Sequence, residues 1–133
     1  MFVTKPITSK MIKVCKTTET ELPKQYLKVL NGILGLTEGE IELTSLIISM
    51  YRKYGADGLR EPYLSKFVFS TDGRKDICTK LNNLSTQNLG NKLKQLVDKG
   101  VLLQADKEYS LNQTLLPQPE VTFRFELVDD KQG

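Results

Sequence analysis

The sequence predicts a small α+β protein, and three patterns lead to that prediction. Apolar residues recur at helical spacing in several stretches that are bounded by capping residues. Residues 101–112 have the pattern of a β-hairpin, and residues 120–128 alternate between apolar and polar side chains. With 133 residues, of which 39% are hydrophobic, the chain suits one compact domain over residues 1–133.

Two elements are expected at the start of the chain. The first is a basic arm or short strand over residues 1–17, and its four lysines are Lys5, Lys10, Lys13 and Lys16. The second is an extra helix over residues 18–35, which Gly35 ends. The apolar stripe expected on this helix consists of Leu22, Tyr26, Val29, Leu30 and Ile33.

The expected core of the domain spans residues 37–112 and begins with a well-marked helix. Thr37 is its N-cap and Glu40 lies three residues later, which is the pattern of a capping box, and Gly55 ends the helix. Its apolar face comprises Ile41, Leu46, Ile47, Met50, Tyr51 and Tyr54. A loop, a brief strand over residues 66–70 and a short helix from Asp72 are expected next.

The helix expected over residues 85–99 has two different faces. Ser85 is a good N-cap, and Gly100 ends the helix. Leu89, Leu93, Leu96 and Val97 share the apolar face. The opposite face collects Gln87, Asn88, Asn91, Lys94, Gln95 and Asp98. Gly90 lies beside the apolar stripe, which indicates close packing of helices, with close approach of a nucleic acid as the alternative.

The remaining pattern consists of strands. Residues 101–104 and 109–112 flank a polar tip and predict the hairpin. After Pro117 and Pro119, the segment 118–133 is expected to contain a strand and a tail, with Val121, Phe123, Phe125 and Leu127 on one face of the strand. A lone strand needs a partner, and residues 10–16 of the same chain or of a second copy are candidates. Pairing between two copies would form a homodimer through these terminal strands.

Composition excludes several classes of function. The chain contains no histidine, the commonest general base and metal ligand. Cys15 and Cys78 match no metal or redox spacing, so we expect both to be small buried residues in a reducing cytoplasm. No catalytic constellation, metal site or cofactor motif is found, so we expect a non-enzyme without a cofactor. No apolar run approaches the length of a membrane span, and no secretory signal is visible.

Positive charge is concentrated in one stretch, residues 74–107, where seven bases stand against three acids. This stretch contains "RKDICTKLNNLSTQNLGNKLKQLVDKGVLL" and the pattern S-x-Q-N-L-x-N-x-L-x-x-L-x-x-K-G-V-L. Over residues 37–112 the chain resembles the winged helix-turn-helix superfamily, including small bacterial and bacteriophage regulators of the MarR group. The resemblance implies a winged-helix core, sequence-specific binding of double-stranded DNA and regulation of transcription in a bacterial or bacteriophage setting. It places the recognition helix at residues 85–99.

The polar face of that helix suits the proposed contact with bases. Asparagine and glutamine present a donor and an acceptor together, which match the N6 and N7 edge of adenine. Lysine, arginine and helix N-terminal amides suit phosphates. The candidate DNA-binding residues are Arg74, Lys75, Lys80, Ser85, Thr86, Gln87, Asn88, Asn91, Lys92, Lys94, Gln95 and the lone basic residue of the wing, Lys107. Two alternatives are an ordinary solvated face, and a winged helix that binds protein in a virion, replication or polymerase assembly.

Overall fold

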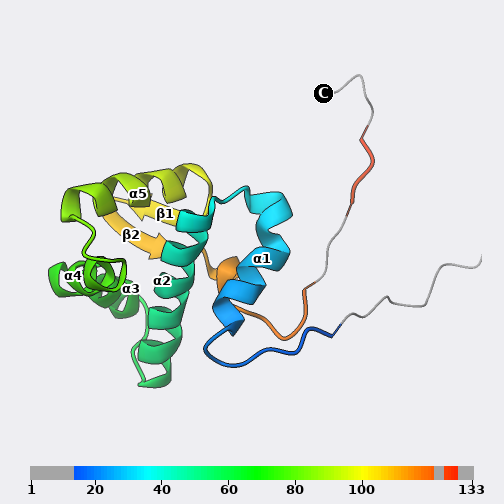
Figure 1. Cartoon of the computed structure of the whole chain (residues 1–133), viewed down its shortest axis with the longest axis horizontal. Coiled ribbons are helices and arrows are strands. Elements are labelled where there is room, and N and C mark those ends of the chain that lie inside the picture. The colour runs from blue at the N-terminus through cyan, green and yellow to red at the C-terminus, as the bar shows by residue number, and fades with distance from the viewer. Residues whose placement is uncertain (1–13, 122–124, 129–133) are drawn as a thin grey trace, which may run out of the picture.

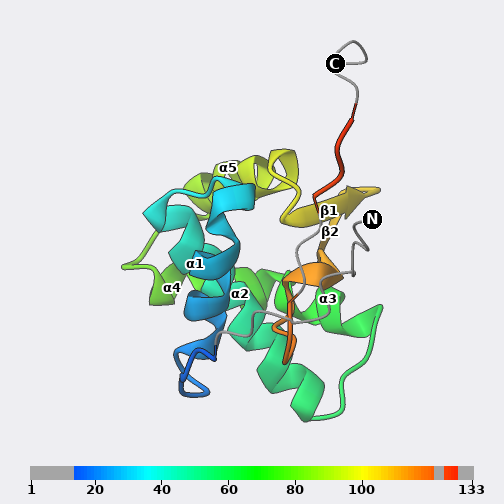
Figure 2. The same ribbon diagram turned by 90° about the vertical axis from the view of Figure 1, so that its right-hand side faces the viewer.

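The structure, a computed structural model, describes residues 14–121 and 125–128. Within them lie five α-helices, one antiparallel pair of strands and a short 3-10 helix, so the α+β class is confirmed. The long helix α2 (Glu38–Ala56) runs through the middle of the molecule (Figure 1). Helix α1 (Leu22–Leu34) packs on one side of α2, and the other α-helices and the hairpin lie on its opposite side. Figure 2 shows α1 in front of α2.

Helix α1 begins and ends as the sequence predicts, but it buries a different stripe. Pro23 lies in its first turn, and Gly35 ends it with a left-handed φ of 66°. Tyr26 and Leu27 are buried, whereas Val29 and Ile33 are 53% and 71% exposed. The predicted stripe is therefore wrong at Val29 and Ile33, because α1 contacts the body through a narrower line of residues centred on Leu27.

Helix α2 forms the predicted capping box. The Thr37 hydroxyl accepts a hydrogen bond from the Glu40 amide at 3.2 Å, and Glu40 Oε1 accepts one from the Thr37 amide at 2.9 Å. Its burial is wider than a single predicted face, since Leu43 and Ile48 are also fully buried. The reason is that α2 contacts α1 on one side and both α3 and α4 on the other, so two faces are covered.

The strand predicted over residues 66–70 is wrong, because these residues belong mainly to helix α3 (Tyr63–Val68). Backbone hydrogen bonds of helical type run from the Lys66 amide to Pro62 and from the Phe69 amide to Ser65. Leu64 and Val68, four residues apart, are buried together, whereas Phe67 is half exposed. Helical spacing of the buried residues therefore outweighs the strand preference of the aromatic and β-branched side chains.

Helix α4 (Thr71–Lys80) starts within a residue of its predicted position and is capped by the Ser70 hydroxyl, which accepts from the Gly73 amide at 3.1 Å. A Cβ built on Gly73 would lie 2.1 Å from the carbonyl oxygen of Val68, so only glycine allows α3 and α4 to meet this closely. Asn82 and Asn83, both with φ of 58°, then turn the chain into α5 (Thr86–Asp98).

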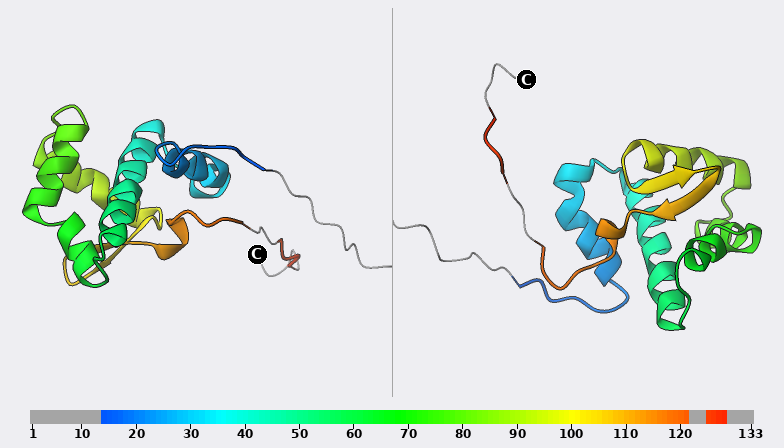
Figure 3. Two further views of the ribbon diagram at one scale, coloured as in Figure 1. Left: turned by 90° about the horizontal axis from the view of Figure 1, so that it is seen from below. Right: turned by 180° about the vertical axis from the view of Figure 1, so that it is seen from behind.

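The predicted hairpin is confirmed as β1 (Leu102–Ala105) paired with β2 (Glu108–Leu111). Its two-residue turn consists of Asp106 and Lys107, both with positive φ, as the tight turns that suit strand twist require. Strand β1 contacts α5 and strand β2 contacts α3. The 3-10 helix η1 (Gln113–Leu115) lies beside α1 (Figure 3). There the Tyr26 hydroxyl donates to the Thr114 carbonyl at 3.1 Å.

The described part of the predicted C-terminal strand is not a strand. Residues 120, 121 and 125–128 have no strand pairing, and Phe125 is 93% exposed. Residues 14–16 of the proposed partner segment also lie outside any strand, while residues 10–13 and 122–124 fall outside the described residues, as do Lys5, Lys10 and Lys13. Alternation alone does not hold a strand that has no neighbour to bond with. Cys78 is buried as expected, but Cys15, in the extended segment before α1, is exposed.

Candidate nucleic-acid interface

Helix α5 is fixed in place by its capping and by its apolar face. The Ser85 hydroxyl accepts a hydrogen bond from the Asn88 amide at 3.1 Å, so the predicted N-cap is confirmed. Leu89, Leu93 and Leu96 are at most 1% exposed and pack in the main core. Because this face is anchored, the opposite face of α5 is held toward solvent in one orientation.

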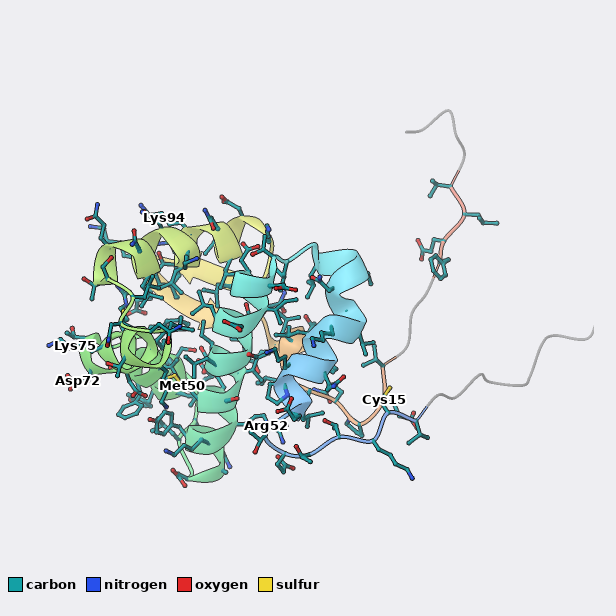
Figure 4. All side chains as sticks on the ribbon, in the orientation of Figure 1. Cys15, Met50, Arg52, Asp72, Lys75 and Lys94 are labelled. Atoms are coloured by element: carbon teal, nitrogen blue, oxygen red, sulfur yellow. The ribbon has the colours of Figure 1, made fainter. Side chains whose placement is uncertain are left out.

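The polar face of α5 is exposed as the helical spacing predicts. The exposed side chains are Thr86, Gln87, Asn88, Asn91, Lys94, Gln95 and Asp98. The amide groups of Gln87, Asn88, Asn91 and Gln95 form no hydrogen bond with any residue that the structure describes. Figure 4 shows the Lys94 side chain projecting from the outer side of α5.

Two asparagines outside α5 hold the fold together. Asn31 donates to the Leu36 carbonyl at 3.1 Å and accepts from the Leu36 amide at 2.7 Å, which closes the connection between α1 and α2. Asn112 donates to the Gly100 carbonyl at 3.0 Å and so fastens the end of the hairpin to the end of α5. The amides of α5 have no comparable structural role, which leaves their donors and acceptors available to a partner.

The lysines within α5 and the lysine at its C-terminal end differ in their partners. Lys92 is half-buried and Lys94 is exposed, and neither forms an ion pair with the described residues. Lys99 instead lies 2.6 Å from Glu40 Oε1 and also donates to the Gly35 carbonyl, so it secures α5 to the start of α2. Burial raises the pKa of the Glu40 carboxyl, but hydrogen bonds from Lys99 and Thr37 outweigh burial, and the pKa is lowered overall.

The predicted cations of α4 do not form one group with those of α5. Lys75 is exposed at the end of the molecule that carries α4 (Figure 4). Lys80 is 3.2 Å from Asp76, an exposed pair one helical turn apart, which contributes little to stability. Arg74 is half-buried, and its Nε donates to the Phe69 carbonyl at 3.0 Å.

Arg74 and Lys107 line the same pocket, and the sequence does not predict that they lie together. The pocket has a volume of about 420 Å³ and lies between α3, α4 and the hairpin. Its walls include Phe69, Tyr109, Glu108 and a third cation, Lys66. Lys66 was missed because its segment was predicted to be a strand, and no sequence spacing relates it to Arg74 and Lys107.

Gly90 is not explained by the packing that the sequence predicts for it. A Cβ built on Gly90 would have no heavy atom within 4 Å, so the expectation of a close helix contact is wrong. The helix therefore keeps a residue that costs up to about 1 kcal/mol relative to alanine, although the fold leaves room for a side chain.

No protein-family model, curated protein or solved structure matched the chain. No helix among residues 14–121 and 125–128 is long and apolar enough to cross a membrane. Across the same residues, no group of three or more acidic, cysteine or histidine side chains is arranged to hold a metal ion. What the described surface does offer is a rigid helix with unpartnered amides, flanking lysines and a separate cationic pocket.

Proposed function

We propose that this chain binds double-stranded DNA in a sequence-specific manner and acts as a regulator of transcription. The observation that carries the proposal is the polar face of α5, whose amide groups have no partner in the described chain while the opposite face is buried. The element order supports a winged helix-turn-helix, since α4, a short turn, α5 and a hairpin follow one another. Helix α3 stands in place of the strand that the sequence predicts over residues 66–70, so the element order before α4 differs from the one on which the resemblance was based.

The chemistry of the face suits the major groove. A side-chain amide forms paired hydrogen bonds with adenine, and Gln87 and Asn91, one turn apart, are placed to read neighbouring bases. Lys92 and Lys94 lie on the flanks of the same helix, where contact with phosphates fixes the register of the protein on the duplex. Asp98 marks the far end of the face, because a carboxylate is unfavourable beside phosphates.

A selection from randomised duplexes tests the proposal. Asn91→Ala and Gln87→Ala should each lower affinity for the preferred site by about 1–3 kcal/mol, with a much smaller effect on random duplex. Stability should change by no more than about 0.5 kcal/mol, because both side chains are exposed. Gln25→Ala is the matched control, since Gln25 is an exposed helical glutamine on α1. Identical site preferences for the wild type and both α5 variants would refute base reading by α5.

A second candidate function is supported by exposed apolar side chains. Val29 and Ile33 on α1, together with Tyr63 and Phe67 on α3, are at least half exposed. Apolar groups at a surface favour contact with another protein, as in a winged helix that belongs to a larger assembly or in a homodimer. Salt distinguishes the two functions, because affinity for DNA falls steeply as salt rises, whereas association through apolar surfaces does not.

A further inference from the structure

The pocket between α3, α4 and the hairpin has no part in base reading by α5, yet its charge is unbalanced. Lys66 comes from α3, Arg74 from α4 and Lys107 from the hairpin turn, and Glu108 is the one carboxylate in the lining. None of the three cations forms an ion pair with the described residues. Three segments that are distant in sequence thus line one concave site with a net charge of about +2, and a second carboxylate, that of Glu61, lies 2.8 Å from the Ser65 hydroxyl of the lining.

Arg74 is held in place at the pocket by its neighbours. Its Nε donates to the Phe69 carbonyl at 3.0 Å, and its guanidinium carbon lies 5.5 Å from the centroid of the Tyr109 ring. Both aromatic residues are buried, and their ring centroids are 5.8 Å apart, so they form a firm wall behind the arginine. The two terminal nitrogens have no hydrogen-bond acceptor within the described chain. A planar guanidinium held in this way offers paired donors to an anionic oxygen group without losing much freedom on binding.

The frame of the pocket is also rigid. The close contact at Gly73 fixes α3 against α4. The Leu111 amide donates to the Tyr51 hydroxyl at 3.1 Å, and that hydroxyl is 2.5 Å from the Ser65 hydroxyl, so strand β2 is tied through α2 to α3. The two left-handed residues of the turn then fix the backbone from which Lys107 extends. Lys66 and Lys107 are exposed, so their side chains are free to move toward a ligand while Arg74 stays in place.

We infer that this pocket binds a phosphate group through Lys66, Arg74 and Lys107. A phosphate has several acceptor oxygens and a charge of about −1 to −2, which matches three donors from three directions and the net charge of the site. Two sources share this chemistry: the backbone of a nucleic acid, and a free phosphate compound small enough for the pocket. The inference does not require α5 to read bases.

Titration with inorganic phosphate, followed through the backbone amide signals in NMR spectra at constant ionic strength, tests the inference. Phosphate should shift the signals of residues 66, 74 and 107 in a saturable way, and chloride should not. Combining Lys66→Ala and Lys107→Ala should weaken phosphate binding about tenfold or more, whereas Glu108→Gln should strengthen it by removing a like charge. Both lysines are exposed, so the double variant should keep its fold.

Lys28→Ala is the matched control, because Lys28 is an exposed lysine on α1 outside the pocket. The inference is overturned if phosphate produces no saturable shift around the pocket. Equal weakening by Lys28→Ala and by the double variant would overturn it too, since general charge would then explain the binding.

Duplex DNA identifies the source of the phosphate. If the double variant flattens the plot of log affinity against log salt by about one unit per lysine, the pocket holds a backbone phosphate. If inorganic phosphate binds but that slope is unchanged, the ligand is a free phosphate compound. If the Gln87 and Asn91 variants keep the wild-type site preference, base reading by α5 is refuted. That result says nothing against phosphate binding in the pocket.

Discussion

Removing one hydroxyl from the core should destabilise the protein by a predictable amount. Tyr51 is 2% exposed, and its hydroxyl accepts the hydrogen bond of the buried Leu111 amide at 3.1 Å. The same hydroxyl bonds to Ser65, whose own hydroxyl lies 2.8 Å from both carboxylate oxygens of Glu61. Because the Leu111 amide is a donor, the Tyr51 hydroxyl is free to donate to Ser65, which donates to Glu61.

The variant Tyr51→Phe keeps the ring and its packing against Phe69 but leaves the Leu111 amide without an acceptor. An unpaired buried amide costs about 1–3 kcal/mol. For a domain of this size each kcal/mol lowers Tm by about 4 °C, so we expect Tm to fall by roughly 4–12 °C. Burial also raises the pKa of Tyr51, so the hydroxyl is protonated at neutral pH and available as a donor.

Urea unfolding followed by circular dichroism measures the loss, and the slope of the transition should not change. Tyr63→Phe is the matched control, because the Tyr63 side chain is 66% exposed and no hydrogen bond of its hydroxyl is present among the described residues. Equal midpoints for wild type and Tyr51→Phe would refute the assignment of this hydroxyl as the acceptor of the Leu111 amide.

The same substitution at two helical glycines should have opposite effects in urea unfolding. Gly73→Ala should destabilise the fold by more than about 1 kcal/mol, because the new Cβ would clash with the Val68 carbonyl. Gly90→Ala should stabilise the fold by up to about 1 kcal/mol, because a Cβ there meets no other atom. A loss of stability in Gly90→Ala would contradict the open space beside Gly90. Glu40→Gln should lower the free energy of unfolding at neutral pH, because a carboxyl whose pKa is below its ordinary value of 4.5 in the folded state stabilises the fold when it is ionised. In the wild type this stabilisation is lost as pH falls through the lowered pKa of Glu40. Its acid-unfolding curve should accordingly be flatter than that of the wild type, and parallel curves would rule out a stabilising ion pair with Lys99.

Local signals in the sequence predicted most of the secondary structure. The capping box of Thr37 and Glu40, the Ser85 cap and the hairpin are correct because each depends on residues within a few positions of one another. The polar face of α5 was also predictable, since amide and charged side chains opposite three buried leucines favour exposure of that face.

The predictions that are wrong concern segments whose burial depends on residues far away in the sequence. Residues 66–70 have strand-like composition, but the segment forms a helix that packs against α2 and α4. This helix buries Leu64 and Val68 on the same side. Val29 and Ile33 have helical spacing and yet stay exposed, because nothing in the described chain covers that side of α1. Periodicity indicates which residues share a face, and only the neighbouring elements decide whether that face is buried.

The sequence by itself determined the helix caps, the hairpin, the buried leucines of α5 and the amides opposite them, because helix and turn geometry relate residues that are close along the chain. Only the tertiary structure decided which cations are available. It paired Lys99 with Glu40, and it brought Arg74 into one pocket with Lys66 and Lys107. The first grouping joins the end of α5 to the start of α2, and the second arises from the packing of α3, α4 and the hairpin. Packing between distant segments leaves no regular spacing in the sequence.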